Sequence, residues 1–183
     1  MERSTIFAGF GGQGILFAGK VLAEAALLEN REVLWIPSYG PEMRGGTASC
    51  TVIVSDREVG SPIVDRADHA VVLNPPSLTK YGPLIAPDGV LVVNTSLIEA
   101  EPSREDIVVV AVPCTALARR AGDDRLVSVV ALGALLGRRR FMEPASVHAA
   151  IARLLGERHA ELIEADIAAF EAGYEAGLEP VIA

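Results

Sequence analysis

Two glycine-rich segments contain most of the residues in this chain that could bind a ligand. The first, Gly9-Phe10-Gly11-Gly12-Gln13-Gly14, follows a short apolar run and precedes a helix-like run. Glycines let the backbone turn tightly, and a helix that starts behind such a turn presents unpaired N–H groups to an anion. We therefore predict a phosphate-binding turn. Its candidate residues are Gly9, Gly11, Gly12, Gln13 and Gly14.

The second segment is the loop Pro37-Ser38-Tyr39-Gly40-Pro41-Glu42-Met43-Arg44-Gly45-Gly46. Its two prolines and three glycines exclude regular structure. A solvated connection is one interpretation of this loop. Loops that carry such mixed side chains more often bind something, and we favour a substrate or interface role. The candidate residues are Ser38, Tyr39, Glu42, Met43, Arg44, Gly45 and Gly46.

The glycine spacing at Gly9, Gly11 and Gly14 matches the fingerprint of dinucleotide-binding Rossmann folds. That fingerprint also requires an acidic residue at the end of the second strand, to bind the ribose hydroxyls. The chain has Ile36-Pro37-Ser38 at this point. A dinucleotide-dependent oxidoreductase is therefore disfavoured, and a turn that accepts one phosphate remains.

No other set of residues predicts catalysis or metal binding. The three histidines lie far apart in the sequence, and no Gly-x-Ser-x-Gly motif is present, so no nucleophile–histidine set can be argued. Cys50 and Cys114 are widely separated and lack metal-ligand spacing. We predict no catalytic residue, no metal ligand and no cofactor bound by this chain alone.

Composition predicts a single α/β domain over residues 1–183. The chain is 50% hydrophobic with only 5% aromatic residues, which suits a core of small aliphatic side chains around a buried parallel sheet. A net charge of −8 disfavours a nucleic-acid partner. No apolar run reaches the ~20 residues of a membrane span, and the N-terminus is unlike a signal peptide. We expect a cytoplasmic protein with no membrane contact.

The hydrophobic pattern predicts a Rossmann-like fold with a mostly parallel sheet, helices on both faces and a helical C-terminal part. The strand at 47–55 is expected to be antiparallel, half-exposed and near an edge. Gly137 is expected to end a helix, and Gly173 and Gly177 to loosen another. Expected strands are 4–8, 32–36, 47–55, 69–73, 90–93 and 107–112; expected helices are 13–28, 116–121, 126–137, 144–155 and 159–174. We also expect a turn at 87–89 and a short helix that contains Leu78 and Tyr81 and is capped by Ser77. The helix at 13–28 is apolar almost all round, so it should be covered on more than one side.

Polar residues follow several predicted strands, at Asn74-Pro75, Asn94-Thr95-Ser96 and Pro113-Cys114-Thr115. The carboxyl ends of parallel strands line one crevice, so these residues should lie together. The crevice would be polar but would contain neither an acid–base pair nor a nucleophile. The residues alone therefore indicate a binding or assembly subunit, and a stand-alone nucleotide-binding module remains an alternative.

Several motifs, in this order along the chain, resemble the gamma subunits of 2-oxoacid:ferredoxin oxidoreductases. The glycine turn and the loop from Pro37 to Thr47 are the most informative, and the loop is closer to the 2-oxoglutarate type than to the pyruvate type. A small subunit of an indolepyruvate:ferredoxin oxidoreductase is a related alternative. The further matching motifs are Gly60-Ser61-Pro62, Asn74-Pro75-Pro76-Ser77-Leu78 and Asn94-Thr95-Ser96-Leu97-Ile98.

The resemblance implies a subunit of a complex that converts a 2-oxoacid and coenzyme A to an acyl-CoA, CO2 and reduced ferredoxin. It implies alpha and beta subunits as partners, with a delta subunit as a further candidate. Thiamine diphosphate, Mg²⁺ and iron–sulfur clusters would belong mainly to the other subunits. Expressed alone, the chain should self-associate through its partner-facing surface. Two departures from the family are Ser128 and Asp166, where Asn is common.

The loop generates a first prediction. Arg44 and Glu42 lie in a segment fixed by glycine and proline after the second strand, so we expect them at the subunit interface or at the substrate and coenzyme A channel. Arg44→Ala should lower the activity or the assembly of the complex, measured by turnover and by co-purification. Unchanged turnover in a correctly assembled complex would contradict this role.

Overall fold

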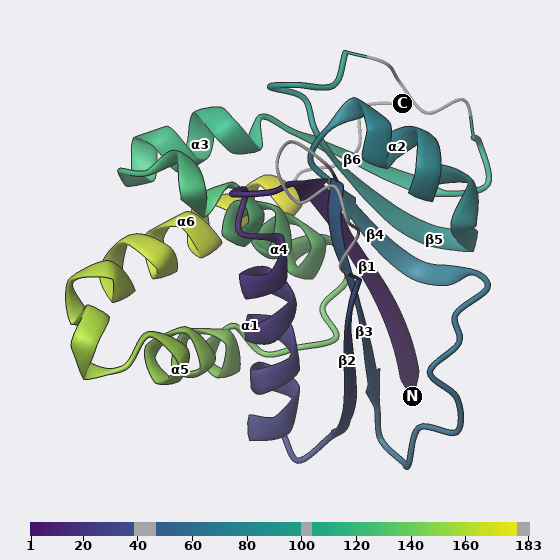
Figure 1. The fold of residues 1–183 in the computed structure, drawn as a ribbon, viewed down its shortest axis with the longest axis horizontal. Coiled ribbons are helices and arrows are strands. Elements are labelled where there is room, and N and C mark those ends of the chain that lie inside the picture. The colour runs from purple at the N-terminus through teal and green to yellow at the C-terminus, as the bar shows by residue number, and fades with distance from the viewer. Residues whose placement is uncertain (39–46, 100–103, 179–183) are drawn as a thin grey trace.

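The computed structural model describes residues 1–38, 47–99 and 104–178, which build one central sheet with helices packed on it (Figure 1). The six strands of this sheet lie in the order β2-β3-β1-β4-β5-β6. β1 lies inside the sheet and runs parallel to β4. The turn that follows β1 therefore lies at the carboxyl end of the parallel strands. The strands are β1 (Glu2–Phe10), β2 (Glu32–Ser38), β3 (Thr47–Ser55), β4 (Ala67–Val72), β5 (Ile85–Asn94) and β6 (Val108–Val112).

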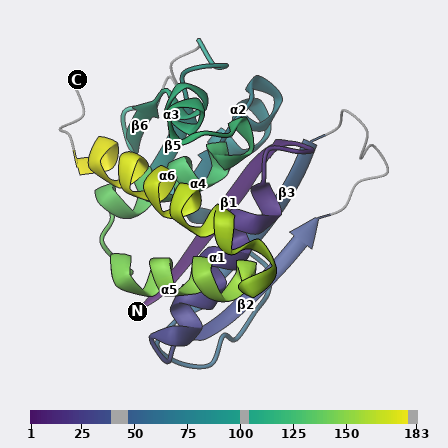
Figure 2. The ribbon, with the colours of Figure 1, turned by 90° about the vertical axis from the view of Figure 1, so that its left-hand side faces the viewer.

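Most of the helices lie on one face of the sheet, and α2 covers the other (Figure 2). The larger core surrounds Phe7 and joins α1, α4, α5 and α6 to the sheet, whereas the smaller core surrounds Ile6 on the α2 side. The expected helices on both faces are therefore confirmed, with unequal layers. The helices are α1 (Ile15–Leu28), α2 (Pro75–Tyr81), α3 (Cys114–Ala121), α4 (Val127–Arg138), α5 (Pro144–Leu155) and α6 (Ala160–Leu178).

The sheet is mixed. β1, β4, β5 and β6 form parallel pairs, and β3 runs antiparallel to both β1 and β2. The predicted direction of the strand at 47–55 is confirmed, and it adjoins the edge strand β2. The expected half exposure is wrong along most of the strand. Ser49, for example, is buried beneath α2. The hydroxyl of Tyr81, the last residue of α2, donates a hydrogen bond of 2.8 Å to Ser49 Oγ.

α1 is apolar nearly all round because it is covered on more than one side, as the sequence indicated. Its two charged side chains are used in contacts with neighbouring elements. The Lys20 ammonium lies 5.2 Å from the ring centroid of Trp35 in β2, and Glu24 pairs with Arg153 of α5 at 2.9 Å. Both contacts help to orient α1 between the sheet and α5.

α4 and α6 pack with their backbones almost in contact, and glycines make this approach possible. A Cβ atom at Gly173 would lie 1.9 Å from the Val130 carbonyl oxygen, and one at Gly177 would lie 2.2 Å from that of Ala134. Gly137 meets Tyr174 in the same way. The predictions that Gly137 ends a helix and that Gly173 and Gly177 loosen one are therefore wrong. All three lie inside helices, where missing side chains allow close packing.

Two smaller predictions are also corrected. Asn74, rather than Ser77, caps α2, since its Oδ1 accepts a 2.8 Å hydrogen bond from the Ser77 N–H. The turn expected at 87–89 lies inside β5, which passes through it with Asp88 at a φ of 61°. Gly89 makes this path possible, because a Cβ there would lie 2.7 Å from the Asp68 carbonyl oxygen.

The contact between α4 and α6 predicts a stability defect. Gly173→Ala must push the two helices apart, and we expect a net loss of about 2 kcal/mol in the free energy of unfolding despite the better helix propensity of Ala. Urea denaturation measures it. Gly60→Ala is the control, because a Cβ at Gly60 would meet no atom within 4 Å. Equal stability of Gly173→Ala and the wild-type chain would contradict the account.

Candidate functional site

The turn between β1 and α1 is closed by its own glutamine. The Phe10 N–H donates a 2.6 Å hydrogen bond to Gln13 Oε1, and the Gln13 N–H donates one of 3.2 Å to the Phe10 carbonyl. Gly12 and Gly14 have φ values of 92° and 74°, which disfavour other residues. Gly9 lies beneath the glutamine, where a Cβ would be 2.6 Å from Gln13 Oε1. Gln13 therefore shapes the turn from within.

Gly14 also allows the turn to pack against the start of α4. A Cβ on Gly14 would lie 2.6 Å from Ser128 Oγ and 3.0 Å from the Arg125 carbonyl oxygen. Gly14 is the N-cap of α1 and provides no capping side chain. The first N–H groups of α1 consequently have no side-chain cap from Gly14, which leaves the positive end of this helix open to an anion.

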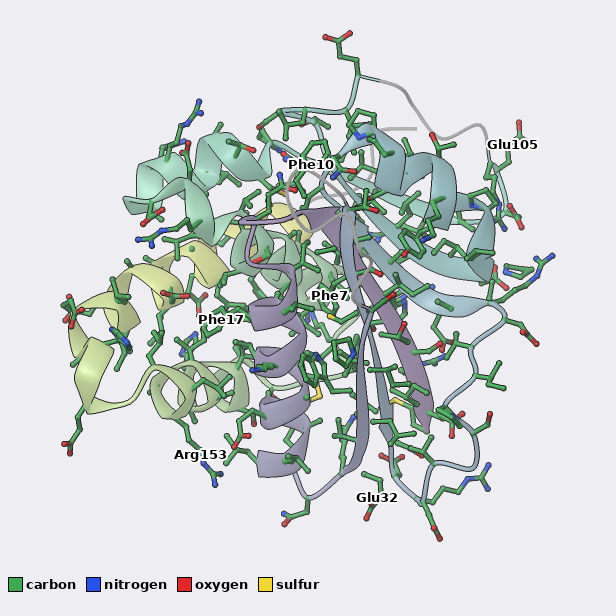
Figure 3. All side chains as sticks on the ribbon, in the orientation of Figure 1. Phe7, Phe10, Phe17, Glu32, Glu105 and Arg153 are labelled. Carbon is green, nitrogen blue, oxygen red and sulfur yellow. The ribbon has the colours of Figure 1, made fainter. Side chains whose placement is uncertain are left out.

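A cavity of about 490 Å³ opens beside the turn, between α1, α6 and the 3₁₀ helix Asp124–Leu126. Most of its wall is apolar. Phe10 lies at the end of β1, and Phe17 extends from α1 towards the C-terminal helices (Figure 3). The lining residues are Phe10, Gly11, Gly12, Gly14, Ile15, Leu16, Phe17, Ser38, Thr47, Ala48, Asp123, Arg125, Leu126, Leu155, Leu162, Ala165 and Asp166.

One carboxylate of this wall has no partner among the residues that the structure describes. Asp166 of α6 is 5% exposed, and no described residue forms a hydrogen bond or an ion pair with it. Its burial, together with the nearby Asp123 charge, raises its pKa from 3.8 to about 6. Asp123, in contrast, has a lowered pKa because the Arg125 guanidinium binds it, with contacts of 2.6 and 2.9 Å. Within the described ranges, the cavity wall thus has one ion pair, Asp123 with Arg125, and one acid without a partner, Asp166.

The structure brings several of the predicted residues to this cavity. Gly11, Gly12 and Gly14 line it, and Ser38 joins them from the end of β2. Gly9 and Gln13 support the turn from outside the cavity wall. The remaining loop candidates, Tyr39, Glu42, Met43, Arg44, Gly45 and Gly46, lie outside the residues that the structure describes.

Sequence reasoning missed Asp123 and Arg125, and it singled out Asp166 only as a departure from the family, not as a site residue. A signal for Asp166 was present, since it follows Ile163 and precedes Phe170 at helical spacing on one face of the last helix. An acidic residue on an otherwise apolar helix face is a candidate for a buried carboxylate. Asp123 and Arg125 gave no such signal, because only the packing of the 3₁₀ helix brings them to α6.

The strand-end polar residues are used to join elements rather than to line the cavity. Asn94 Nδ2 donates a 3.0 Å hydrogen bond to Thr115 Oγ1, and Asn94 Oδ1 accepts from the Ser96 N–H at 3.2 Å. The first bond connects the end of β5 to the start of α3, and the second closes a local turn after β5. None of these residues lines the cavity. The expectation that the strand-end residues lie together is therefore confirmed for Asn94 and Thr115, which bond to each other and do not line the cavity.

The pKa values of three other ionisable groups in the core are shifted so that these groups are uncharged at neutral pH. Burial raises the pKa of both the Cys50 and the Cys114 thiol to about 12. His69 stacks on Phe141 with ring centroids 5.2 Å apart, and burial lowers its pKa to about 4.

Among residues 1–38, 47–99 and 104–178, no group of three metal-ligating side chains is found. In the same ranges, no helix has the length and apolarity to cross a membrane.

The unpaired acid generates a prediction for stability. The folded pKa of Asp166 lies above its ordinary value, so stability is lost as the pH rises from about 4 through 6. At pH 7, Asp166→Asn should raise the free energy of unfolding by about 1–2 kcal/mol, after allowance for solvent at the cavity mouth. The gain should shrink towards pH 4. Urea denaturation across this pH range tests it, and a gain independent of pH would contradict the assigned cause.

Comparison with known proteins places the chain among oxidoreductase subunits. The family model described as pyruvate ferredoxin/flavodoxin oxidoreductase matches residues 4–176. The 2-oxoglutarate synthase subunit KorC of Methanocaldococcus jannaschii is 34% identical over 182 residues, which cover 98% of this chain and 96% of that protein. This relative therefore matches along its whole length.

Two further comparisons concern a longer relative and a solved structure. The ketoisovalerate oxidoreductase subunit VorA of Methanothermobacter thermautotrophicus is 43% identical over 129 residues, which cover 70% of this chain. This chain spans only 27% of the length of that relative. The crystal structure of the gamma subunit of a keto/oxoacid ferredoxin oxidoreductase from Geobacter sulfurreducens superposes with a TM-score of 0.83. The sequence identity is 28%, over 96% of this chain and 98% of that one.

The fold, the glycine turn and the extent of these matches agree with one another. They confirm the resemblance on which the sequence-based expectation rested. The chain belongs to the pyruvate ferredoxin/flavodoxin oxidoreductase family and is similar to its gamma subunits.

Proposed function

We propose that this chain is the gamma subunit of a complex that oxidatively decarboxylates a 2-oxoacid with coenzyme A and reduces ferredoxin. The observation that carries the proposal is the match to a KorC subunit over nearly the whole of both chains.

The other parts of the reaction would belong to partner subunits. Alpha and beta chains, with a delta chain as a further candidate, would carry thiamine diphosphate, Mg²⁺ and the iron–sulfur clusters. Exposed apolar side chains on this chain agree with such partners, since Ile63 is 76% exposed and Leu27 53%. Within the complex, the turn would approach a phosphate of coenzyme A, and the loop with Glu42 and Arg44 would contact a partner or the substrate channel.

The proposed substrate class rests on two relatives that match over most of their length, 96% of one and 88% of the other. Two KorC subunits, from Methanocaldococcus jannaschii and Archaeoglobus fulgidus, align over 96% or more of this chain, which favours 2-oxoglutarate. The higher identity to a ketoisovalerate oxidoreductase subunit over a shorter segment favours a branched-chain 2-oxoacid as the second candidate.

Purification of the tagged chain from its native host tests this function. We expect two or more co-purifying subunits, bound thiamine diphosphate, the visible absorbance of iron–sulfur clusters, and reduction of a viologen dye that requires both a 2-oxoacid and coenzyme A. Rates with 2-oxoglutarate should exceed those with 2-oxoisovalerate, and the reverse order would select the second candidate. Purification of the chain without partners, from cells that contain the activity in another fraction, would refute the proposal.

A further inference from the structure

His69 is buried between the sheet and the segment 139–143, which joins α4 to α5 and which we call the connector. In the register of the sheet, His69 pairs with Thr5 of β1 and with Val90 of β5. It is 3% exposed, and its ring stacks on that of Phe141 in the connector with centroids 5.2 Å apart. Phe141 itself belongs to the larger core. The contact between the two rings therefore attaches the connector to the sheet inside the core.

The connector also determines where α5 begins, because it is bound to the end of α1. The Arg31 guanidinium donates a 2.8 Å hydrogen bond to the Phe141 carbonyl, and the Glu143 N–H donates one of 2.8 Å to Glu29 Oε1. These bonds are partly or fully open to solvent, where a hydrogen bond contributes little net stability. The buried side chains of the connector consequently make the larger contribution to holding α5 in place.

The carboxylate next to His69 in the sequence already binds other donors. Asp68 Oδ2 accepts hydrogen bonds from the Ser4 N–H at 2.8 Å and from the Ser4 hydroxyl at 2.9 Å. Its other oxygen pairs with the Arg3 guanidinium at 3.1 Å. A protonated His69 ring would have to compete with these donors for the carboxylate.

Two guanidinium groups add positive charge around the ring, Arg3 from β1 and Arg139 from the connector. The stacked ring of Phe141 favours a cation only modestly, whereas burial strongly disfavours one. Burial is the largest cause that lowers the pKa of His69 to about 4, and Asp68 acts in the opposite direction. The closed packing and a charged histidine are therefore in conflict at this position.

We propose that protonation of His69 releases Phe141 and the connector from the sheet, and loosens α5 with them. An imidazolium has two N–H donors that need acceptors or water, and the ring of Phe141 covers His69. Turning Phe141 outwards hydrates the charge without unfolding the sheet. Because α5 contributes Leu155 to the cavity beside the glycine turn, the release also changes the candidate site. This inference goes beyond the proposed function, since it concerns the folded chain itself.

The pH range of the release follows from the two states of the histidine. A solvated histidine has a pKa of about 6.5, and burial lowers the pKa of His69 to about 4. Between these values the released state binds a proton that the closed state does not bind. A falling pH therefore favours release, and we expect its equilibrium constant to rise about twentyfold from pH 7 to pH 5.

Hydrogen exchange followed by mass spectrometry on the full 183-residue chain tests this release. Protection factors, which correct for the intrinsic effect of pH on exchange, are compared at pH 7 and pH 5. Those of residues 139–155 should fall about twentyfold, while those of α4 change by less than about twofold, because α4 stays packed on the sheet and on α6. An equal fall in both segments would show that acid unfolds the whole chain, and it would overturn the proposal.

Variants of two histidines assign the effect. His69→Leu keeps an apolar side chain and His69→Gln a polar one, and neither can take up the proton, so both should abolish the fall in protection of residues 139–155. His148→Gln is the matched control, because His148 lies on α5 itself, with Nε2 2.6 Å from a carboxylate oxygen of Glu171. It should keep the response of the wild-type chain. The proposal is overturned if either His69 variant keeps this response, or if His148→Gln abolishes it.

Discussion

The arrangement of the candidate site depends on how closely α4 and α6 approach each other. Glycines at 133, 137, 173 and 177 remove the side chains that would hold the two backbones apart. Because α6 lies so close to α4, Asp166 reaches the region where α4 begins and where the 3₁₀ helix carries Asp123. The same region supports the glycine turn, since Gly14 packs on Ser128. One backbone contact therefore connects the C-terminal helix to the turn after the first strand.

This connection gives the cavity its unusual electrostatics. Buried carboxylates without a partner are rare, because a charged group loses its hydration inside a protein and this costs free energy. Here the acid is held on a helix whose position is set by packing elsewhere. Asp123 adds a like charge nearby, which contributes to the raised pKa of Asp166. The result is a carboxylate with a raised pKa in a mostly apolar cavity wall, and this combination marks a candidate binding site.

Much of the architecture could be predicted from the sequence. Hydrophobic runs located the strands, the antiparallel direction of β3 was expected, and Pro144 marked the start of α5. Errors arose where a residue's local preference was overridden by its surroundings. Asp88 and Gly89 form a turn in many sequences, but here they continue β5 because the strand passes close to Asp68. The sequence identified the glycine turn as part of the candidate site, but it did not identify the part on α6.

The sequence by itself determined the turn, because the left-handed backbone at Gly12 and Gly14 is a local property that only a few residue types tolerate. It also determined that no acidic residue stands at the end of β2, where Ile36-Pro37-Ser38 lies, and its motifs indicated the family. Only the tertiary structure decided what the turn faces. Asp166 and Gly11 lie 155 positions apart in the printed sequence, and no local preference relates them. They line one cavity because glycine-mediated packing of α6 on α4 brings a distant helix to this side of the turn.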